Sequence, residues 1–162
     1  MIVKKQLTQE QALQKIRHYC AYQERCHSEV REKLYSFGLW KKDTELILSQ
    51  LIEEDYLNEE RFAIGFSGGR FRMKHWGRIK IRYELSRKKI SEYCIRRALQ
   101  HIDEADYQRR LKELALDKWL HHRKEKNIFA RKRKVQDYLL QKGYEPDLIG
   151  NMLREMENTN PD

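Results

Sequence analysis

Apolar residues recur four positions apart along this chain, and the same arrangement occurs three times. Residues 30–39, 81–90 and 135–144 each hold two apolar residues four apart, then a glycine or lysine four positions later, then an apolar or aromatic residue. Each is followed by a second apolar pair with the same spacing, at 47 and 51, 95 and 99, and 149 and 153. Because residues four apart share one face of a helix, the pattern predicts an all-α fold of three tandem three-helix repeats, resembling helix-turn-helix units, in an elongated, curved array.

The segment HWGRIKIRYELSRKKI, residues 75–90, also alternates apolar and charged residues as a strand does. Its pair Ile81 and Leu85 matches the pairs in the other repeats, which favours a helix that starts after Gly77. Ile79 and Tyr83 then lie on nearly the opposite face, so we expect this helix to pack on both sides. The long first helices of the repeats are predicted at 9–23, 59–74 and 104–125.

Residues suited to helix ends support these boundaries. Gly38 and Gly143 stand where a helix would end in a left-handed residue. Lys89 takes this position in the second repeat, at a cost of about 1 kcal/mol. The residues predicted to begin helices are Thr8 with Gln11 as a capping box, Ser28, Thr44, Asn58, Ser91 and Pro146.

The net charge of +9 is concentrated in the second repeat. The repeats are predicted at 1–57, 58–102 and 103–157, with a disordered tail at 158–162. Residues 1–57, 58–102 and 103–162 hold 9 basic and 9 acidic, 12 and 4, and 13 and 12 residues, so their net charges are 0, +8 and +1. A local excess of this kind favours a polyanionic partner, such as nucleic acid or an acidic protein surface. The alternative is a solvated basic face that keeps the protein soluble.

The binding residues that we predict are all basic. Arginine guanidinium groups bind phosphate or carboxylate through two parallel hydrogen bonds. Trp76 lies among them and could stack on a base, although a tryptophan at a helix junction is more often part of a core. Four cations that open a helix of the third repeat oppose its dipole, which favours a partner there, unless the run is an extended linker. The predicted set is Arg70, Arg72, Lys74, Arg78, Arg82, Lys88, Arg131, Lys132, Arg133 and Lys134.

The sequence contains no recognisable catalytic motif, and neither GxxxxGK[ST] nor GxGxxG is present. His18, Cys20, Cys26 and His27 match no common zinc spacing, and residues 53–55 fit a turn better than a nuclease site. We therefore expect a protein that is not an enzyme and needs no cofactor or metal. The cysteines are expected to be reduced thiols of a cytoplasmic protein. The start carries no secretory signal and no apolar run approaches the roughly 20 residues that span a bilayer, so we expect no membrane contact.

The segment DYLNEERFAIGFSGGRFRMKHWGRIKIRYELSRKKI, residues 55–90, resembles the core of the RecX family, bacterial regulators of the recombinase RecA. That core reads G-Y-L-(D/N)-(D/E)-x-R-F-A, then an Arg, then G-x-x-(R/K)-I-x-x-E-L-x-x-K-G-I. The matching residues are Tyr56, Leu57, Asn58, Glu59, Arg61, Phe62, Ala63, Arg70, Gly77, Ile81, Glu84, Leu85, Lys88 and Ile90.

The resemblance extends over residues 9–156, because YCAYQERCHSEVREKL and KVQDYLLQKGYEPDLI resemble the first and closing repeats of the family. Three features depart from the family pattern. Asp55 and Lys89 replace glycines, and residues 67–69 (Ser-Gly-Gly) place poor helix formers inside a helix. For these glycines we expect a close contact with another helix, with a hinge as the alternative.

The resemblance implies a regulator that lies in the groove of the RecA–DNA filament and depresses the ATPase, strand-exchange and coprotease activities of RecA, in DNA repair, recombination and the SOS response. The mechanism is binding, and weak nonspecific contact with single- and double-stranded DNA is expected of a monomer with this charge. Two alternatives remain open. One is a nonspecific DNA- or RNA-binding helical-repeat protein that acts without RecA, and the other is a nucleic-acid enzyme.

Overall fold

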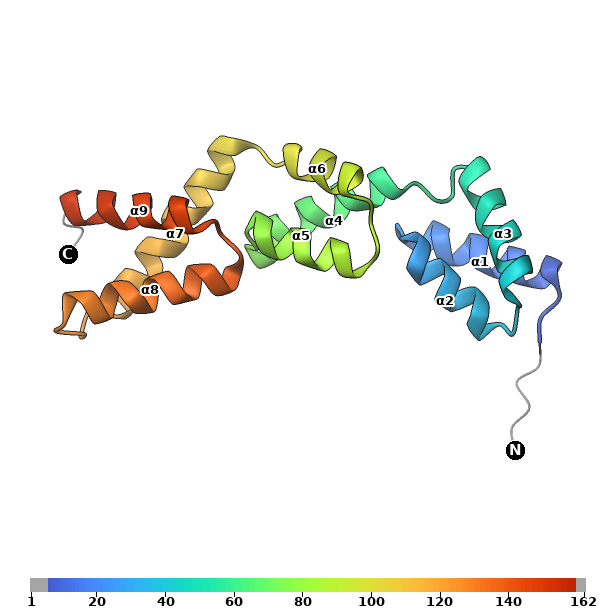
Figure 1. Ribbon diagram of the computed structural model, residues 1–162, viewed down its shortest axis with the longest axis horizontal. Coiled ribbons are helices and arrows are strands. Elements are labelled where there is room, and N and C mark those ends of the chain that lie inside the picture. The colour runs from blue at the N-terminus through green and yellow to red at the C-terminus, as the bar shows by residue number, and fades with distance from the viewer. Residues whose placement is uncertain (1–5, 160–162) are drawn as a thin grey trace, which may run out of the picture. The chain divides into compact units, whose positions relative to one another are not determined.

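The computed structural model describes residues 6–159, and every regular element in that range is a helix (Figure 1). This confirms the all-α fold, and the elements follow the predicted order of three helices per repeat. Within the described range α9 continues two residues into the segment predicted as a tail, while residues 160–162 lie outside it. The helices are α1 (Gln9–Tyr22), α2 (His27–Ser36), α3 (Lys41–Glu53), α4 (Glu59–Lys74), α5 (Arg78–Arg87), α6 (Glu92–Gln100), α7 (Glu104–His121), α8 (Ile128–Lys142) and α9 (Pro146–Thr159).

Most of the predicted helix starts are confirmed. Thr8 and Gln11 form a reciprocal capping box on α1. The Asn58 side chain accepts a hydrogen bond from the Arg61 N–H at 2.8 Å, and Ser91 Oγ accepts one from the Cys94 N–H at 3.3 Å. These side chains satisfy N–H groups that a first helical turn leaves without a backbone partner.

The predictions for Ser28 and Thr44 are wrong. Helix α2 begins one residue before Ser28, and Ser28 Oγ instead donates to the Lys88 carbonyl at 2.9 Å. Helix α3 begins at Lys41, so Thr44 is fully buried within its first turn. The N-cap residues of these helices, Cys26 and Trp40, form no side-chain cap hydrogen bond. Sequence reasoning placed both starts at the nearest capping side chain, whereas these helices begin without one.

Left-handed residues end helices where the repeat pattern places them. Gly38 and Gly143 have φ of 86° and 97°, and Lys89 has φ of 62°, as predicted. Asp55, the other position where the family has glycine, also has φ of 62°. Asp55 and Lys89 therefore carry the cost of a left-handed backbone conformation, which the glycines of the family avoid.

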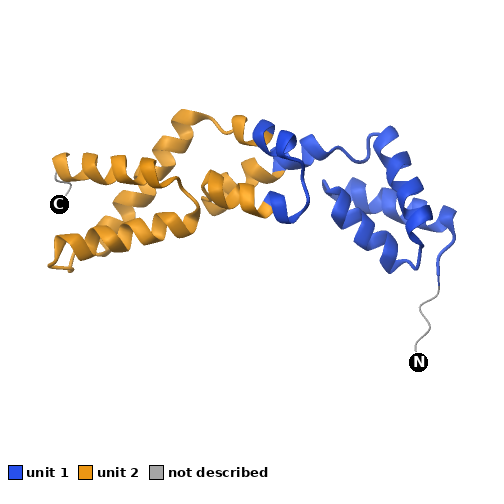
Figure 2. Ribbon diagram, viewed as in Figure 1, with its two compact units in different colours: residues 1–65, 85–97 blue, residues 66–84, 98–162 orange. Residues whose placement is uncertain are grey.

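The chain divides into two compact units (Figure 2). The first comprises residues 1–65 and 85–97, and the second comprises residues 66–84 and 98–162. Helices α4 and α5 contribute residues to both units. The division of the sequence into three repeats at 57/58 and 102/103 remains a prediction.

The core of the first unit lies among α1, α2 and α3, which contact one another pairwise. Its members are the apolar residues that the four-residue spacing singles out, together with their neighbours one turn away. They are Ala12, Ile16, Cys20, Val30, Leu34, Leu39, Ile47, Leu48, Leu51 and Leu57.

Helices α7, α8 and α9 pack pairwise in the second unit. Their buried residues include Tyr107, Leu111, Trp119, Val135, Leu139, Tyr144, Ile149 and Met152. In α5, Ile81 is fully buried, whereas Ile79 and Tyr83 are 48% and 61% exposed. The expectation that the face carrying Ile79 and Tyr83 is packed is therefore wrong, and the contact of this helix with a neighbour involves its first residues instead.

Helix α4 continues without interruption through its glycines. A Cβ at Gly69 would meet no atom within 4 Å, and the atoms nearest to one at Gly68 would be those of the Arg72 guanidinium on the same helix. The predicted close contact with another helix is therefore wrong for Gly69. In the part of the chain that the structure describes, no helix is long and apolar enough to cross a membrane.

Candidate functional site

The second compact unit gathers predicted binding residues around one aromatic side chain. The Arg70 guanidinium lies 4.6 Å from the centre of the Phe66 ring and 5.5 Å from that of Trp76. The ammonium groups of Lys74 and Lys80 lie 5.8 Å and 4.8 Å from the Trp76 ring. Trp76 itself is half-buried, with its ring edge against Phe66. We call Arg70, Lys74, Trp76 and Lys80 the tryptophan cluster.

The tryptophan cluster has the chemistry of an anion site. Arg70 Nε is buried and has no hydrogen-bond partner, and a buried donor left in that state costs roughly 1–3 kcal/mol. The charge of Arg70 and of the neighbouring lysines would attract a phosphate or carboxylate group. Lys80 was omitted from the predicted set. Its position four residues after Trp76, at the start of α5, could have indicated that it lies near the Trp76 ring.

Arg72, also predicted, is exposed on α4 and folds back along its own helix over Gly68. The absence of a side chain at Gly68 leaves room for this guanidinium. Arg82 is half-exposed on α5. Both remain accessible to a partner.

Arg78 serves a structural role inside the second unit. Its guanidinium pairs with Glu145 at 2.8 Å and also with Glu104, and it lies 3.7 Å from the Tyr107 ring centre. Burial alone would lower the pKa of Arg78, but the hydrogen bond and charge of Glu145 outweigh it and raise that pKa. The Tyr107 hydroxyl accepts from the Arg78 N–H at 3.0 Å and donates to Glu145, and burial raises the pKa of this phenol. A partner that contacts Arg78 directly would have to replace these ion pairs.

The start of α5 docks on the end of α8 through backbone groups. The Gly77 N–H donates to the Lys142 carbonyl at 2.8 Å, and the Ile79 N–H donates to the Gly143 carbonyl at 2.9 Å. The carbonyls belong to the end of α8 and the N–H groups to the start of α5. Neither kind of group has a partner within its own helix, so the two helix ends satisfy each other. A Cβ on Gly77 would lie 2.5 Å from the Tyr144 nitrogen and closer still to the Gly143 carbonyl, so only glycine fits.

Lys88 also holds its own unit together. Its ammonium pairs with Glu29 at 3.0 Å, and its carbonyl accepts from Ser28. Arg61, which matches the family pattern, pairs with Glu24 at 2.6 Å and Asp55 at 3.1 Å. Within the first unit these ion pairs join α2 to Lys88, which follows α5, and the α1–α2 connection to α4.

The run Arg131–Lys134 divides between the interior and the surface. Arg131 is 4% exposed and donates to the Trp119 carbonyl at 2.9 Å from Nε and 2.6 Å from an NH₂ group. It is committed to the core, and its inclusion in the binding set is corrected. Lys132 pairs with Glu157, and Lys134 pairs with Glu125 at 2.7 Å. Arg133 is exposed.

The dipole argument for this run also changes. Helix α8 begins at Ile128, and the Asn127 side chain caps it by accepting from the Phe129 and Ala130 N–H groups. The four cations are therefore helical and begin at the fourth residue of the helix. The dipole acts mainly within the first turn, so their position carries little electrostatic penalty. The alternative of an extended basic linker is wrong for the same reason.

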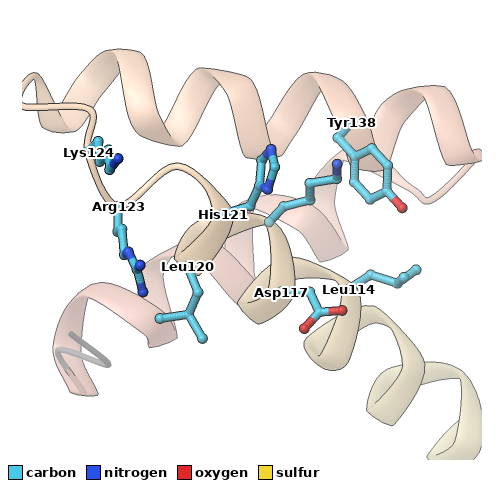
Figure 3. Close-up of a pocket in the computed structure, with 8 residues that line it drawn as sticks. Leu114, Asp117, Leu120, His121, Arg123, Lys124 and Tyr138 are labelled. Carbon is cyan, nitrogen blue, oxygen red and sulfur yellow. The ribbon is translucent and has the colours of Figure 1, made fainter.

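A cavity of about 760 Å³ lies between α7 and α8 in the second unit (Figure 3). Tyr138 stands on one side, and Leu114 and Asp117 of α7 stand on another. Its basic lining is Lys118, His121, Arg123 and Lys124. The Lys118 ammonium lies 4.4 Å from the Tyr138 ring centre. This cavity adds cationic surface to the third repeat that the sequence analysis did not assign.

The cysteines occupy packed positions. Cys20, Cys26 and Cys94 are buried free thiols, and burial raises the pKa of Cys20 to about 11. Among the described residues, no three His, Cys, Asp or Glu side chains gather as metal ligands would. Burial also lowers the pKa of His27, which disfavours its charged form.

Comparison with known families gives two adjacent matches. Residues 58–99 match the model of the second three-helix domain of RecX, and residues 104–152 match that of the third three-helix domain. The protein named regulatory protein RecX from Clostridium perfringens (strain 13 / Type A) is 31% identical over 131 residues, which cover 80% of this chain and 61% of the relative. Its namesake from Salmonella arizonae is 34% identical over 112 residues, covering 69% and 65%. The chain thus spans about three fifths of the length of the first of these relatives.

Two solved structures share the fold. A crystal structure of regulatory protein RecX aligns with a TM-score of 0.82 at 25% identity, covering 90% of this chain and 71% of the other. The crystal structure of RecX from Lactobacillus salivarius aligns with a TM-score of 0.84 at 22% identity, covering 92% and 96%. The matched helical repeats are the ones that the four-residue spacing predicts.

Proposed function

Because the chain belongs to the RecX family, we propose that it binds the RecA–DNA filament and modulates, mostly by inhibition, the ATPase, recombinase and coprotease activities of RecA. The relatives are named regulatory proteins, which supports a role exerted through binding. The tryptophan cluster is the observation that carries the proposal for this chain. It offers cations around one aromatic ring, with a buried donor that lacks a partner.

The contact set follows from the side chains that remain accessible. Arg70, Lys74 and Lys80 meet the partner from the tryptophan cluster, and Arg72 and Arg82 extend this surface. Arg133 provides a second contact on α8. Such a surface suits the phosphates of filament DNA and the carboxylates of a protein equally, because guanidinium groups bind both.

The remaining predicted residues take smaller parts. Lys88, Lys132 and Lys134 are held by carboxylates within the chain, so a partner would have to replace an existing ion pair. Arg78 and Arg131 shape the second unit without meeting the partner. Their effect on binding is indirect, through the stability of the helices that carry the contact set.

The test is the single-stranded-DNA-dependent ATPase of RecA, titrated with this protein. Binding of the protein to the same DNA without RecA is measured at two salt concentrations. We expect the ATPase to fall at protein concentrations too low to coat naked DNA. An unchanged ATPase, together with salt-sensitive binding to naked DNA, would refute the proposal and leave a nonspecific nucleic-acid-binding protein.

A matched pair of variants locates the contact surface. Arg72→Glu with Lys74→Glu reverses the exposed charge of Lys74 in the tryptophan cluster and that of its neighbour Arg72, and we expect it to abolish inhibition while leaving melting unchanged. Lys41→Glu with Lys42→Glu makes the same change in charge at the exposed start of α3 and should keep inhibition. An equal loss of inhibition in both variants would show that only net charge matters and would refute the assigned surface.

A further inference from the structure

The first unit contains a basic and aromatic cavity that none of the predicted binding residues touches. It measures about 350 Å³ and lies between α1 and α2 and the connection that joins them. The residues on which the argument rests are Lys15, Tyr19, Tyr22, Arg25, Lys33 and Phe37. Among the described residues that line it, none is acidic.

The cations of this cavity are positioned over aromatic rings. The Arg25 guanidinium lies 3.8 Å from the Tyr19 ring centre, and its Nε donates to the Tyr19 carbonyl at 3.3 Å. The Lys33 ammonium lies 5.5 Å and 5.7 Å from the rings of Tyr19 and Phe37, and that of Lys15 lies 5.9 Å from Phe37. In the described part of the chain these three cations form no ion pair. None of the three therefore makes a direct ion pair with a described carboxylate.

Tyr22 supplies an open stacking surface beside them. It ends α1 and is 80% exposed, whereas Tyr19 is half-buried beneath Arg25. Exposed aromatic rings beside unpaired cations are the combination that binds single-stranded nucleic acid, because bases stack on the rings while the cations contact phosphates. A double helix keeps its bases stacked internally and cannot use the ring in this way.

The third repeat has a similar arrangement at the corresponding place. The repeat pattern that pairs Val30 with Val135 also pairs Lys33 with Tyr138. Lys33 of α2 lies over Tyr19 of α1, and Tyr138 of α8 lies under Lys118 of α7. In each of these two repeats one cation thus lies over one ring between the first and second helices, and Figure 3 shows Tyr138 at the cavity of the third repeat.

We propose that the cavity between α1 and α2 binds single-stranded nucleic acid, with a base stacked on Tyr22 and phosphates held by Lys15, Arg25 and Lys33. The site is separate from the surfaces assigned to the filament. Its test needs no RecA, so the outcomes of the two proposals are independent.

The test measures the fluorescence anisotropy of a labelled oligo-dT 12-mer with the full chain, and of a duplex of the same length. Tyr22→Ala should weaken binding of the single strand about tenfold, as expected for the loss of one stacked base, while Tyr22→Phe keeps it. Lys15→Gln with Lys33→Gln should reduce the slope of log K against log salt by about 1.4, since each phosphate contact contributes about 0.7 with single strands. The duplex should not respond to Tyr22→Ala.

Controls on the same unit separate this site from general charge and exposure. Tyr35→Ala removes an exposed ring of α2 outside the cavity, and Lys41→Gln with Lys42→Gln removes two exposed cations of α3. The first should leave affinity unchanged, and the second should reduce the salt slope by less than the cavity variant does. Equal effects of Tyr22→Ala and Tyr35→Ala, or tight binding of a poly-glutamate peptide in place of oligo-dT, would overturn the proposal. Circular dichroism of each variant checks that the helices are retained.

Discussion

Replacing Gly77 by alanine should test the docking of α5 on α8. The added Cβ would meet backbone atoms of Gly143 and Tyr144, which cannot move aside as a flexible side chain does. Overpacking of this kind costs about 1–3 kcal/mol. Separation of the two helix ends would also break two backbone hydrogen bonds, at 2.8 Å and 2.9 Å, each contributing about 1 kcal/mol. We therefore expect Gly77→Ala to lower the free energy of unfolding of the second unit by about 3–5 kcal/mol.

The matched control is Gly69→Ala, because a Cβ there would meet no atom within 4 Å. Alanine in a helix interior is favoured over glycine by about 0.5–1 kcal/mol, so this substitution should stabilise the protein. Replacing glycine by alanine should then raise the free energy of unfolding at position 69 and lower it at position 77. Glycine is preferred to alanine at the position before a helix, which accounts for a small part of the loss at Gly77, and the docked helix ends account for the rest.

Urea unfolding monitored by tryptophan fluorescence suits this comparison. Trp76 and Trp119 belong to the second unit, whereas Trp40 in the first unit is already 75% exposed and should respond weakly. Fluorescence therefore reports mainly the unit that contains the junction, and circular dichroism reports both units. A Gly77→Ala protein within about 0.5 kcal/mol of the parent would refute the tight backbone contact, since substitutions away from such features fall in that range.

Three further predictions concern stability and reactivity. Arg131→Met should lower the free energy of unfolding in urea by about 2–4 kcal/mol, because it removes two charge-assisted hydrogen bonds to a buried carbonyl. The control Arg133→Gln should leave that free energy unchanged, and equal effects of the two substitutions would contradict the assignment of Arg131 to the core. With a pKa of about 11, Cys20 should be roughly one part in a thousand thiolate at pH 8, so a disulfide reagent should label it only after denaturant is added, and rapid labelling of the native protein would contradict its burial. The hydrogen bond from Arg31 lowers the pKa of Glu45 below its ordinary 4.5. This pair therefore stabilises the fold above about pH 4.5, and its contribution is lost as the pH falls through the lowered pKa. Glu45→Gln should reduce the decrease of Tm between pH 7 and pH 3.

The fold was largely predictable because helical periodicity is a local property. Pairs such as Ile81 and Leu85 indicate which face of a helix is buried, and the left-handed residues Gly38, Lys89 and Gly143 stand where the repeated pattern places them. Where the sequence misled, a neighbour distant in the chain decided the outcome. Ser28 resembled a helix cap, but its hydroxyl bonds a carbonyl 60 residues away.

The candidate site was less predictable because charge was counted along the chain, while ion pairs form across it. Arg78 contributes to the +8 of the second repeat, yet Glu145, 67 residues away, holds it in place. Lys88 is held in the same way by Glu29, 59 residues away. Neither carboxylate lies in the repeat whose excess suggested a binding surface. A net charge summed over a segment therefore overestimates the number of cations that a partner can reach.

The reverse error applies to the first repeat. Its 9 basic and 9 acidic residues cancel in a count, but not in space. Glu54 and Glu45 are taken by Arg17 and Arg31, which lie outside the cavity between α1 and α2. The cations that line that cavity lie over aromatic rings and make no ion pair with a described carboxylate. A repeat with no net charge can thus present a cationic site. The signal for such a site in the sequence is that tyrosine alternates with lysine and arginine on one face of a helix, and net charge does not measure this pattern.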